Sequence, residues 1–444
     1  MVRGGTRYLD RLLRRKHVQV TLDQDRTDTK SSQTAGGLLV RLQKRNVESA
    51  EDAENAVDTE NVKNVKNTKN AWHATAACSA RAAGGIRSRL DYEAMRDGGR
   101  RLRITVLMGD DSPEREISLA SGQAVTAALR ERGHQVDAVT IEHVGDVLAN
   151  TQLSATDIVF PALHGGFGED GHLQAVFEVM QLPYALSGPL ACALAMNKAA
   201  AKRLMRGAGI PTPDWLMVAW DLASGRPRGI SGADSGANIG PENTLTIEYI
   251  QKRATEEIGW PMVIKPNAAG SSVNVAILQN PAEFADAFEQ VASRHQDVLL
   301  EKYIPGREVT GTIFLGRRLP LLEIRPRQGF YDYANKYTPG ASEYLVPAPV
   351  HSPVYEQISD DALRVFDLLG CTGVARVDFR LDGNRYYCLE VNTIPGMTAM
   401  SLVPMAAASV GIDFATMLED LCLDALARQR TVDPTRIGNQ EQGS

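Results

Sequence analysis

Cysteines are few in this sequence, and their spacing gives them no joint role. A chain of 444 residues has five, without any CxxC pair, at Cys78, Cys192, Cys371, Cys388 and Cys422. An odd number of separated cysteines implies neither a disulfide framework nor a zinc site. We expect buried thiols in a reducing compartment, and hence a cytoplasmic protein.

Long hydrophobic runs and a basic excess are missing as well. No stretch of about 18 apolar residues occurs, which disfavours a membrane-spanning role. The net charge is -6, whereas a general nucleic-acid binder needs a basic face. With 43% hydrophobic and 23% charged residues, the composition is ordinary for a soluble chain of two or three domains.

The first hundred residues differ in composition from the rest. The stretch 46–70 is polar and rich in Asn, so it cannot bury enough apolar surface to offset the entropy of ordering. We expect residues 1–100 to form a disordered extension. Its basic start leaves open a transit peptide or a membrane-surface helix, although the acidic stretch that follows disfavours both. A non-native start, with Met95 as the true one, is a further alternative.

The remaining chain predicts an α/β protein with three structured regions. From residue 101, apolar strands alternate with helix-period stretches, which is typical of βαβ units and a parallel sheet. We therefore expect a Rossmann-like domain at 101–195. A central domain is predicted at 196–303, a C-terminal domain at 304–430 and a flexible tail at 431–444.

The segment "RVDFRLDGNRYYCLEVNTIPGM", 376–397, predicts a β-hairpin with polar side chains on one face. If the connection has an odd number of residues, one face carries Arg376, Asp378, Cys388, Glu390 and Asn392, opposite Val377, Phe379, Tyr387, Leu389 and Val391. A two-residue turn at Asp382-Gly383 would instead place Asp378 and Glu390 on opposite faces, unless a bulge intervened.

Two carboxylates and an amide oxygen on one face would suit magnesium. This cation takes hard oxygen ligands, keeps some waters and completes its shell with phosphates. We therefore interpret Asp378, Glu390 and Asn392 as a nucleotide-metal site, with Arg376 placed to neutralise charge on a transferred phosphoryl group. The alternative is a solvated sheet face with incidental charges.

Two further stretches could bind a nucleotide, and a third could cover the site. In "VIKPNAAGSSVN", Lys265 precedes a turn of small residues whose N–H groups could approach phosphates, although no Walker A pattern occurs. In "VLLEKYIPGREVTGTI", Glu301 and Lys302 could contact an adenine edge and Glu308 the ribose. An exposed salt-bridge pair is the alternative for Glu301 and Lys302. The aromatic loop "YDYANKYTPGASEY" has the character of an active-site lid.

Taken together, these stretches resemble the ATP-grasp family, and within it the D-alanine:D-alanine ligases. The resemblance runs from about Arg103 to Leu423. Six motifs occur in the family's order: "EREISLASG", "ALHGGFGEDG", "KPNAAGSSV", "YDYANKY", "GVARVDF" and "EVNTIPGMTAMSLVP". It implies a Rossmann-like domain followed by a two-part ATP-grasp fold.

The resemblance also implies a reaction and roles for residues. ATP would phosphorylate one D-alanine to an acyl phosphate, which a second D-alanine attacks, giving a dipeptide for peptidoglycan synthesis. The implied catalytic residues are Glu114, Ser271, Tyr337, Arg376 and Gly396. The implied substrate-binding residues are His164, Lys336, Ser401 and Leu402. The implied ATP-binding residues are Lys198, Lys265, Glu301, Lys302, Ile304 and Glu308. Two Mg²⁺ or Mn²⁺ ions would be held by Asp378, Glu390 and Asn392, and a homodimer is implied.

The sequence departs from the family pattern at two positions. Asp110 follows Gly109 where the family usually has a glycine pair, and Asn274 stands where a glycine usually follows "SSV". Both changes restrict backbone freedom near ligands. Two alternatives to the dipeptide reaction remain: a D-alanine:D-lactate ligase, which Tyr337 disfavours, and an inactive ATP-grasp scaffold whose N-terminal extension is an interaction arm.

Overall fold

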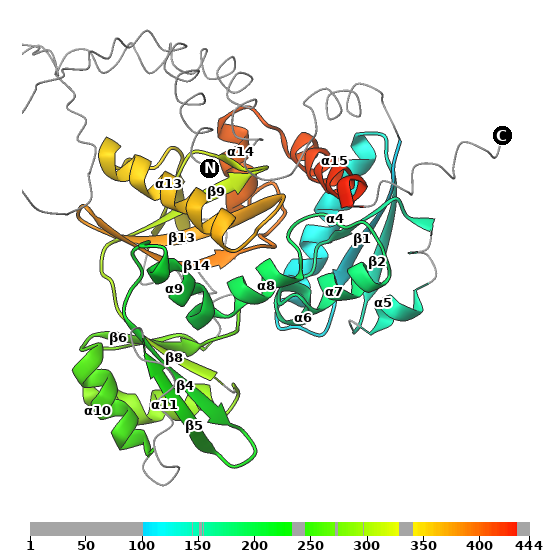
Figure 1. Ribbon diagram of the computed structural model, residues 1–444. Helices are drawn as coiled ribbons and strands as arrows, with labels where there is room; N and C mark the ends of the chain where they lie inside the picture. The colour runs from blue at the N-terminus through cyan, green and yellow to red at the C-terminus, as the bar shows by residue number, and fades with distance from the viewer. Residues whose placement is uncertain are drawn as a thin grey trace, which may run out of the picture. The chain divides into compact units, whose positions relative to one another are not determined.

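The computed structural model describes residues 101–143, 145–150, 153, 155–232, 245–270, 274–295, 297–327 and 341–432. The predicted extension at 1–100 lies outside these residues, as do Cys78, Ser271, Lys336 and Tyr337. The described part is a mixed α/β fold with one parallel and two antiparallel sheets, so the predicted fold class is confirmed. Figure 1 shows the order of its elements.

The first sheet is parallel, as the βαβ pattern predicts. Its strand order is β2-β1-β3, with β1 at Arg103–Gly109, β2 at Gln135–Ile141 and β3 at Ile158–Pro161. All residues of β1 after Arg103 are buried, which is typical of a central parallel strand covered on both faces. The helices of this region are α4 (Arg115–Glu131), α5 (Asp146–Ala149), α6 (Gly166–Glu169), α7 (His172–Val179) and α8 (Pro189–Met196).

The second sheet is antiparallel, in the order β5-β4-β8-β6-β7. Its strands are β4 (Trp215–Asp221), β5 (Arg226–Gly232), β6 (Met262–Pro266), β7 (Ala276–Leu278) and β8 (Asp297–Lys302). The helices α9 (Lys198–Gly207), α10 (Ile247–Glu257) and α11 (Phe284–Ala292) accompany it. Side chains cap two of these helices: Asn197 accepts a hydrogen bond from the N–H of Ala200, and Thr246 accepts one from that of Tyr249.

The third sheet carries the predicted hairpin and has the order β12-β11-β9-β13-β14, with β10 paired to β9. Its strands are β9 (Arg307–Phe314), β10 (Arg317–Arg318), β11 (Leu322–Pro326), β12 (Ser342–Leu345), β13 (Val374–Asp382) and β14 (Arg385–Asn392). Helix α13 (Ser352–Leu368) lies along this sheet (Figure 1). Its buried residues share one core with β9, β13, β14, α8 and α9.

The last two helices, α14 (Leu402–Ser409) and α15 (Phe414–Val432), pack back onto the first sheet. Leu418 and Leu421 of α15 are fully buried in one core with Ile104 of β1 and Leu129 of α4. The far end of the chain therefore completes the core of the parallel sheet. No single described helix has the length and hydropathy to span a membrane, and the only candidate is the pair α14 and α15, which meet at 102°.

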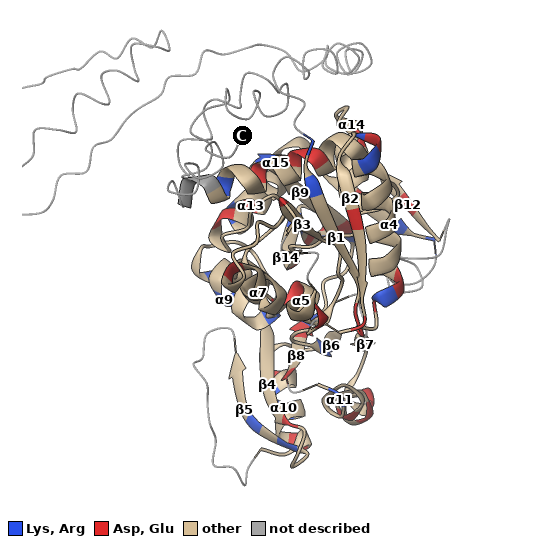
Figure 2. Ribbon diagram, turned by 90° about the vertical axis from the view of Figure 1, so that its right-hand side faces the viewer, with Lys and Arg blue, Asp and Glu red and all other residues tan. Residues whose placement is uncertain are grey.

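The distribution of charged residues and the burial of the cysteines agree with what the composition predicts. Figure 2 shows acidic and basic residues interspersed over the described elements. Four of the predicted buried thiols are buried and unpaired, namely Cys192, Cys371, Cys388 and Cys422. Burial raises the pKa of each of these thiols, so they stay protonated and inert near neutral pH.

The packing of α15 predicts a large cost for truncating Leu421. Leu421→Ala removes a fully buried side chain from the first core, and such changes cost about 2–5 kcal/mol. We expect a lower unfolding midpoint in thermal denaturation followed by circular dichroism. Val179→Ala is the control, because Val179 is 84% exposed. A midpoint for Leu421→Ala equal to that of the control would contradict the packing.

Candidate functional site

The β13–β14 hairpin carries the predicted polar residues on a single face. Arg376 lies opposite Asn392, and Asp378 opposite Glu390. Asp382 pairs with Arg385, so the turn has two residues, Gly383 and Asn384, and a register shift follows Asp378. The structure thus has the two-residue turn with an intervening bulge, which is the condition under which such a turn keeps both carboxylates together. The turn itself lies one residue later than Asp382-Gly383.

The bulge also corrects the predicted faces of the residues beyond it. Cys388, expected on the polar face, pairs with Phe379 and is fully buried in the apolar core. Leu389, expected on the apolar face, lines a pocket, and Tyr387 pairs with Arg380. The reason is parity: one extra residue in β14 exchanges the two faces on the turn side of the bulge.

Each carboxylate of this face has a cation beside it. Arg376 donates to Asp378 from Nε (2.9 Å to Oδ1) and from Nη2 (2.8 Å to Oδ2). Lys198 at the start of α9 lies 3.4 Å from Glu390, and its ammonium also donates to the carbonyl of Ala269 at 2.7 Å. The side chains of Asp378 and Glu390 are partly exposed, at 22% and 34%. The face is therefore electrostatically balanced, and both carboxylates remain partly exposed.

A cavity of about 580 Å³ lies in front of this face. Its walls come from α4, the loop after β3, α8, the Gly270 turn, β12, β14 and the start of α14. Nine of the predicted site residues line it, namely Glu114, His164, Lys198, Arg376, Glu390, Asn392, Gly396, Ser401 and Leu402. Residues from all three predicted domains therefore meet around one space.

A second, smaller pocket of about 90 Å³ adjoins the first. Five of the six predicted nucleotide residues line it, namely Lys198, Lys265, Glu301, Lys302 and Ile304. The two pockets share four lining residues, namely Lys198, Ala269, Gly270 and Glu390, and they therefore adjoin beside the carboxylate face. The small pocket therefore lies next to Glu390 and Asn392, two of the residues predicted to bind the metal.

Two predicted residues do not line either pocket but contact residues that do. Glu308 accepts a hydrogen bond at 2.8 Å from Arg380, whose Nε donates to the carbonyl of Ile304. Arg380 lines the small pocket, and the sequence analysis did not single it out. The sequence did hold one indication of its position: Arg380 is two residues after Asp378 on the same strand, and side chains with this spacing share a face. Asp378, the other residue, is held by Arg376 of the large cavity.

Glu301 is not the exposed salt-bridge partner that the alternative interpretation described. It is 2% exposed and accepts from Lys202 at 2.6 Å and from Lys265 at 2.7 Å. Burial favours the neutral acid, but the two ammonium groups outweigh it and lower the pKa of Glu301. Lys202 was missed in the sequence, where only its spacing of one helical turn from Lys198 marks it.

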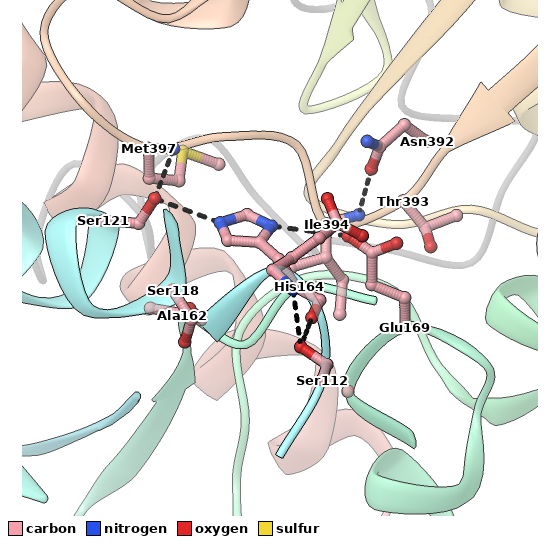
Figure 3. A network of polar contacts seen from close by, with 12 residues as sticks. Ser112, Ser118, Ser121, Ala162, His164, Glu169, Asn392, Thr393, Ile394 and Met397 are labelled. Carbon is pink, nitrogen blue, oxygen red and sulfur yellow. Dashed lines mark hydrogen bonds and ion pairs between the residues drawn. The ribbon is translucent and has the colours of Figure 1, made fainter. Parts of the chain in front are cut away.

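His164 lies at the centre of a buried network rather than alone (Figure 3). Its ring contacts the hydroxyl of Ser121 at 3.0 Å through Nε2 and the carboxylate of Glu169 at 3.3 Å through Nδ1. The N–H of Met397 donates to Ser121 at 3.4 Å, which connects α4 to the loop after β14. Ser121 and Glu169 were missed, although both belong to the quoted motifs. The network holds the loop that contains Gly396.

Glu114 lies at the end of α4 that faces the cavity, and two glycines make room for it. It immediately precedes the helix and is 7% exposed. A Cβ added at Gly165 or at Gly270 would lie 2.7 Å from its Oε2 atom. The loop after β3 and the turn after β6 therefore both pack against this carboxylate, which leaves it directed at the space between them.

Ser401 and Leu402 form the start of α14, as the anion-site interpretation requires. Ser401 precedes the first helical residue, and its hydroxyl accepts from the N–H of Thr398 at 3.1 Å. Both residues line the large cavity together with Gly396. Unpaired N–H groups at a helix N-terminus favour an anion, so this end of the cavity suits a carboxylate.

Both departures from the family pattern occur at left-handed backbone positions. Asp110 has φ +80° and Asn274 has φ +57°. Glycine adopts such angles without strain, and Asn and Asp tolerate them better than other residues. Asp110 also accepts a hydrogen bond from the N–H of Asp111 at 2.7 Å, and Asn274 contacts His295 at 3.0 Å. The substitutions therefore preserve the backbone that a glycine would provide.

The backbone angle of Asn274 predicts a difference between two substitutions. Asn274→Gly and Asn274→Ala both remove the contact with His295, but only alanine is strained at φ +57°. We expect the alanine variant to be less stable than the glycine variant by about 1 kcal/mol. Thermal midpoints by differential scanning calorimetry test this. A glycine variant no more stable than the alanine variant would contradict the left-handed assignment.

The donor set fits a magnesium ion that is completed by phosphates. Among the described residues, no three His, Cys, Asp or Glu side chains form a metal cluster by themselves. Asp378 and Glu390 supply two carboxylates, and Asn392 adds an amide oxygen that now accepts from the N–H of Ile394 at 2.9 Å. Mg²⁺ is commonly bound by one or two carboxylates plus substrate phosphates, so these residues suit it when a nucleotide is present.

Comparison with protein families gives two matches. The family described as "D-ala D-ala ligase C-terminus" matches residues 237–423, and that described as "D-ala D-ala ligase N-terminus" matches residues 144–187. The chain is 40% identical over 328 residues to the D-alanine--D-alanine ligase of Syntrophotalea carbinolica, covering 74% of this chain and 97% of that protein. It is 42% identical over 333 residues to the one from Desulforudis audaxviator, with coverage of 74% and 99%.

Solved structures of ligases that act on D-alanine also match this chain. The D-alanine--D-alanine ligase of Bacillus anthracis complexed with ATP superimposes with a TM-score of 0.61 and 28% identity, covering 75% of this chain and 100% of that one. The VanG D-Ala:D-Ser ligase of Enterococcus faecalis gives 0.58 and 26%, with coverage of 73% and 100%. The identities to the first two relatives, over nearly their full lengths, establish that this chain belongs to the D-alanine--D-alanine ligase family.

Proposed function

We propose that the protein joins two D-alanine molecules with ATP, forming D-alanyl-D-alanine, ADP and phosphate. The observation that carries the proposal is that the two pockets adjoin at Lys198 and Glu390, because this places the residues predicted to bind the nucleotide beside a cavity lined by residues predicted to bind the amino acids. The similarity to curated D-alanine--D-alanine ligases supports the choice of substrate.

The small pocket would hold the nucleotide. Lys198 and Lys265 would bind its phosphates, since both line the pocket and ammonium groups are strong phosphate partners. The main chain and side chains of Glu301, Lys302 and Ile304 would surround the adenine, and Glu308 would hold the ribose. The carboxylate of Glu301 is occupied by two lysines, so its first role is to hold Lys265 beside the pocket.

Asp378, Glu390 and Asn392 would hold two Mg²⁺ or Mn²⁺ ions. When bound, such ions would screen the negative charge that develops on the phosphates during phosphoryl transfer. Arg376 now neutralises Asp378, and Lys198 lies beside Glu390. Arg376 and Lys198 therefore lie where their charges could also pair with phosphate or acyl-phosphate oxygens.

The large cavity would hold the two amino acids. Glu114 would bind the ammonium of the first D-alanine, and His164 would lie beside that substrate. The carboxylate oxygen of this first D-alanine would attack the γ-phosphorus of ATP, and ADP would leave. Ser401 and Leu402 would bind the carboxylate of the second D-alanine, whose amine attacks the acyl carbon. Phosphate then leaves and the amine loses its proton.

Arg376 and the N–H of Gly396 would stabilise the oxyanion formed in that attack, because both line the cavity next to the reacting groups. The family resemblance adds three further residues to the site. Ser271 and Tyr337 would form hydrogen bonds with Glu114, and Lys336 would bind substrate. The product would serve peptidoglycan precursor synthesis in the cytoplasm, and we propose a homodimer on the same resemblance.

ADP release that depends on D-alanine tests the proposed reaction. Wild-type protein with ATP, Mg²⁺ and D-alanine is expected to release ADP and form the dipeptide, as measured by a coupled assay and mass spectrometry. Asp378→Ala and Glu390→Ala should each lower kcat by about a hundredfold or more, because charge stabilisation at the phosphates is lost. Unchanged rates in both variants would refute the metal assignment.

The acceptor is tested in the same assay. D-Lactate and D-serine replace the second D-alanine, since a structural relative is named a D-Ala:D-Ser ligase. We expect the D-alanine dipeptide to dominate near neutral pH. A depsipeptide or a mixed D-alanyl-D-serine product as the main species would overturn the choice of acceptor. Binding of ATP without any product would instead favour the inactive scaffold.

Gly270→Ala tests the position of Glu114. The new Cβ would lie 2.7 Å from Glu114 Oε2, the mobile end of that side chain, so the carboxylate must move while the backbone can stay. We expect the KM for D-alanine to rise by about ten- to a hundredfold. Gly229→Ala is the matched control, because nothing lies within 4 Å of its added Cβ. A KM for D-alanine unchanged from this control would argue against Glu114 as the ammonium site.

A further inference from the structure

Lys202 is a fully buried lysine that the proposed reaction leaves without a role. Its side chain is 0% exposed, and it lies one turn after Lys198 on α9. Its ammonium donates to Glu301 at 2.6 Å and to the hydroxyl of Thr212 at 2.7 Å, and it lies 5.2 Å from the centre of the Trp215 ring. It lines neither of the two pockets, so in this structure its ammonium does not face the space proposed for the nucleotide.

Glu301 therefore has two basic partners of different character. Lys265 reaches it at 2.7 Å from β6, has a side chain that is 10% exposed and lines the small pocket. Lys202 approaches from the interior and has no access to that pocket. If Lys265 turns to bind a phosphate, Glu301 would lose one of its two counter-ions. Leaving a buried carboxylate without any counter-ion is strongly unfavourable, so Lys202 is the partner that must stay.

Lys202 also connects the second sheet to β14, the strand that carries Glu390 and Asn392. Thr212, which accepts from Lys202, donates its hydroxyl proton to the carbonyl of Cys388 at 2.9 Å. Cys388 precedes Leu389 and Glu390 on β14, where the bulge sets the carboxylate face. Lys202 thus contacts β8 directly and β14 through the hydroxyl of Thr212.

We infer that Lys202 is a positioning residue for ATP: it is the permanent counter-ion of Glu301, and it thereby leaves Lys265 free to bind the phosphates. The inference rests on the proposed function in that the small pocket takes ATP. Without Lys202, Glu301 would retain Lys265 in a one-to-one buried pair, and the phosphates would have to compete with a carboxylate for that lysine. The expected consequence is weaker ATP binding, with little effect on D-alanine.

The charge of Lys202 is itself set by its surroundings. The pKa of Lys202 is lowered to about 8, chiefly by burial and also by the nearby charge of Lys265, while Glu301 and the Cys388 thiol act in the opposite direction and raise it. Lys202 is therefore mostly protonated at neutral pH and loses its charge as pH rises above about 8. Arg206 lies over the ring of Trp215, and its charge is paired with Asp214 at 2.6 Å.

The first experiment compares Lys202→Met and Lys202→Arg with Lys252→Met as the matched control. Lys252 is a surface lysine whose side chain is 72% exposed. ATP affinity is measured by isothermal titration calorimetry with Mg²⁺ and no D-alanine, so the result does not depend on ligation. We expect Lys202→Met to weaken ATP binding by roughly tenfold or more. Lys202→Arg should recover part of the affinity, and Lys252→Met should match the wild type.

A double-mutant cycle decides between charge balance and packing. In a Glu301→Gln background the carboxylate is gone, so adding Lys202→Met should change ATP affinity by less than about twofold. The double variant buries no unpaired carboxylate, and it therefore remains informative if the single Lys202→Met variant does not fold. Equal losses of affinity in both backgrounds would overturn the inference, and so would a folded Lys202→Met with wild-type affinity.

Kinetics and pH separate this role from a structural one. With active enzyme, Lys202→Met should raise the KM for ATP while the KM for D-alanine stays unchanged. A general loss of folding would instead lower the active fraction and leave both KM values as they are. Wild-type affinity for ATP should fall above pH 8, and Lys202→Arg should flatten that decline. If wild-type protein binds ATP normally but forms no dipeptide, the proposed function fails while the result on Lys202 stands.

Discussion

The separation of the two faces of the β13–β14 hairpin is the constraint on which the site depends. One face must be apolar because α8, α9 and α13 pack on it, and the other must carry carboxylates that stay accessible. Strand parity alone would split Asp378 from Glu390 across a two-residue turn. The bulge at Leu389 satisfies both demands at once, since it restores the carboxylates to one face and keeps Cys388 in the core.

The buried cluster of Lys202, Glu301 and Lys265 extends this face into the second sheet. Its members come from α9, β8 and β6, and Thr212 carries the contact on to β14. Three charges inside the protein would be costly in isolation, but each is paired, and the net excess of one positive charge faces the pocket proposed for phosphates. The electrostatics of the pocket proposed for the nucleotide and the geometry of the carboxylate face are thus connected through one series of contacts.

The first sheet contributes through a glycine-lined gap instead. Glu114, Gly165 and Gly270 come from three different elements, and the absence of a Cβ at both glycines lets the carboxylate reach between them. The His164 network joins the same region to the loop carrying Gly396. Core packing of α15 beneath β1 and α4 supports this arrangement from the far end of the chain. The substrate side of the cavity is therefore held by contacts between distant segments.

From the sequence alone, the order of elements and the parallel first sheet follow, because periodicity is a local property. The motifs and the family resemblance also identified thirteen of the residues that line the two pockets. The order of the six motifs also pointed to the family. Only the tertiary structure decided the register of the hairpin, since one extra residue exchanges the faces and no local pattern marks it. Only the structure revealed Lys202 as the partner of Glu301, because a contact between residues 99 positions apart depends on how β8 and α9 pack. Asp110 and Asn274 looked like departures in the sequence, and their positive φ angles explain why both are tolerated.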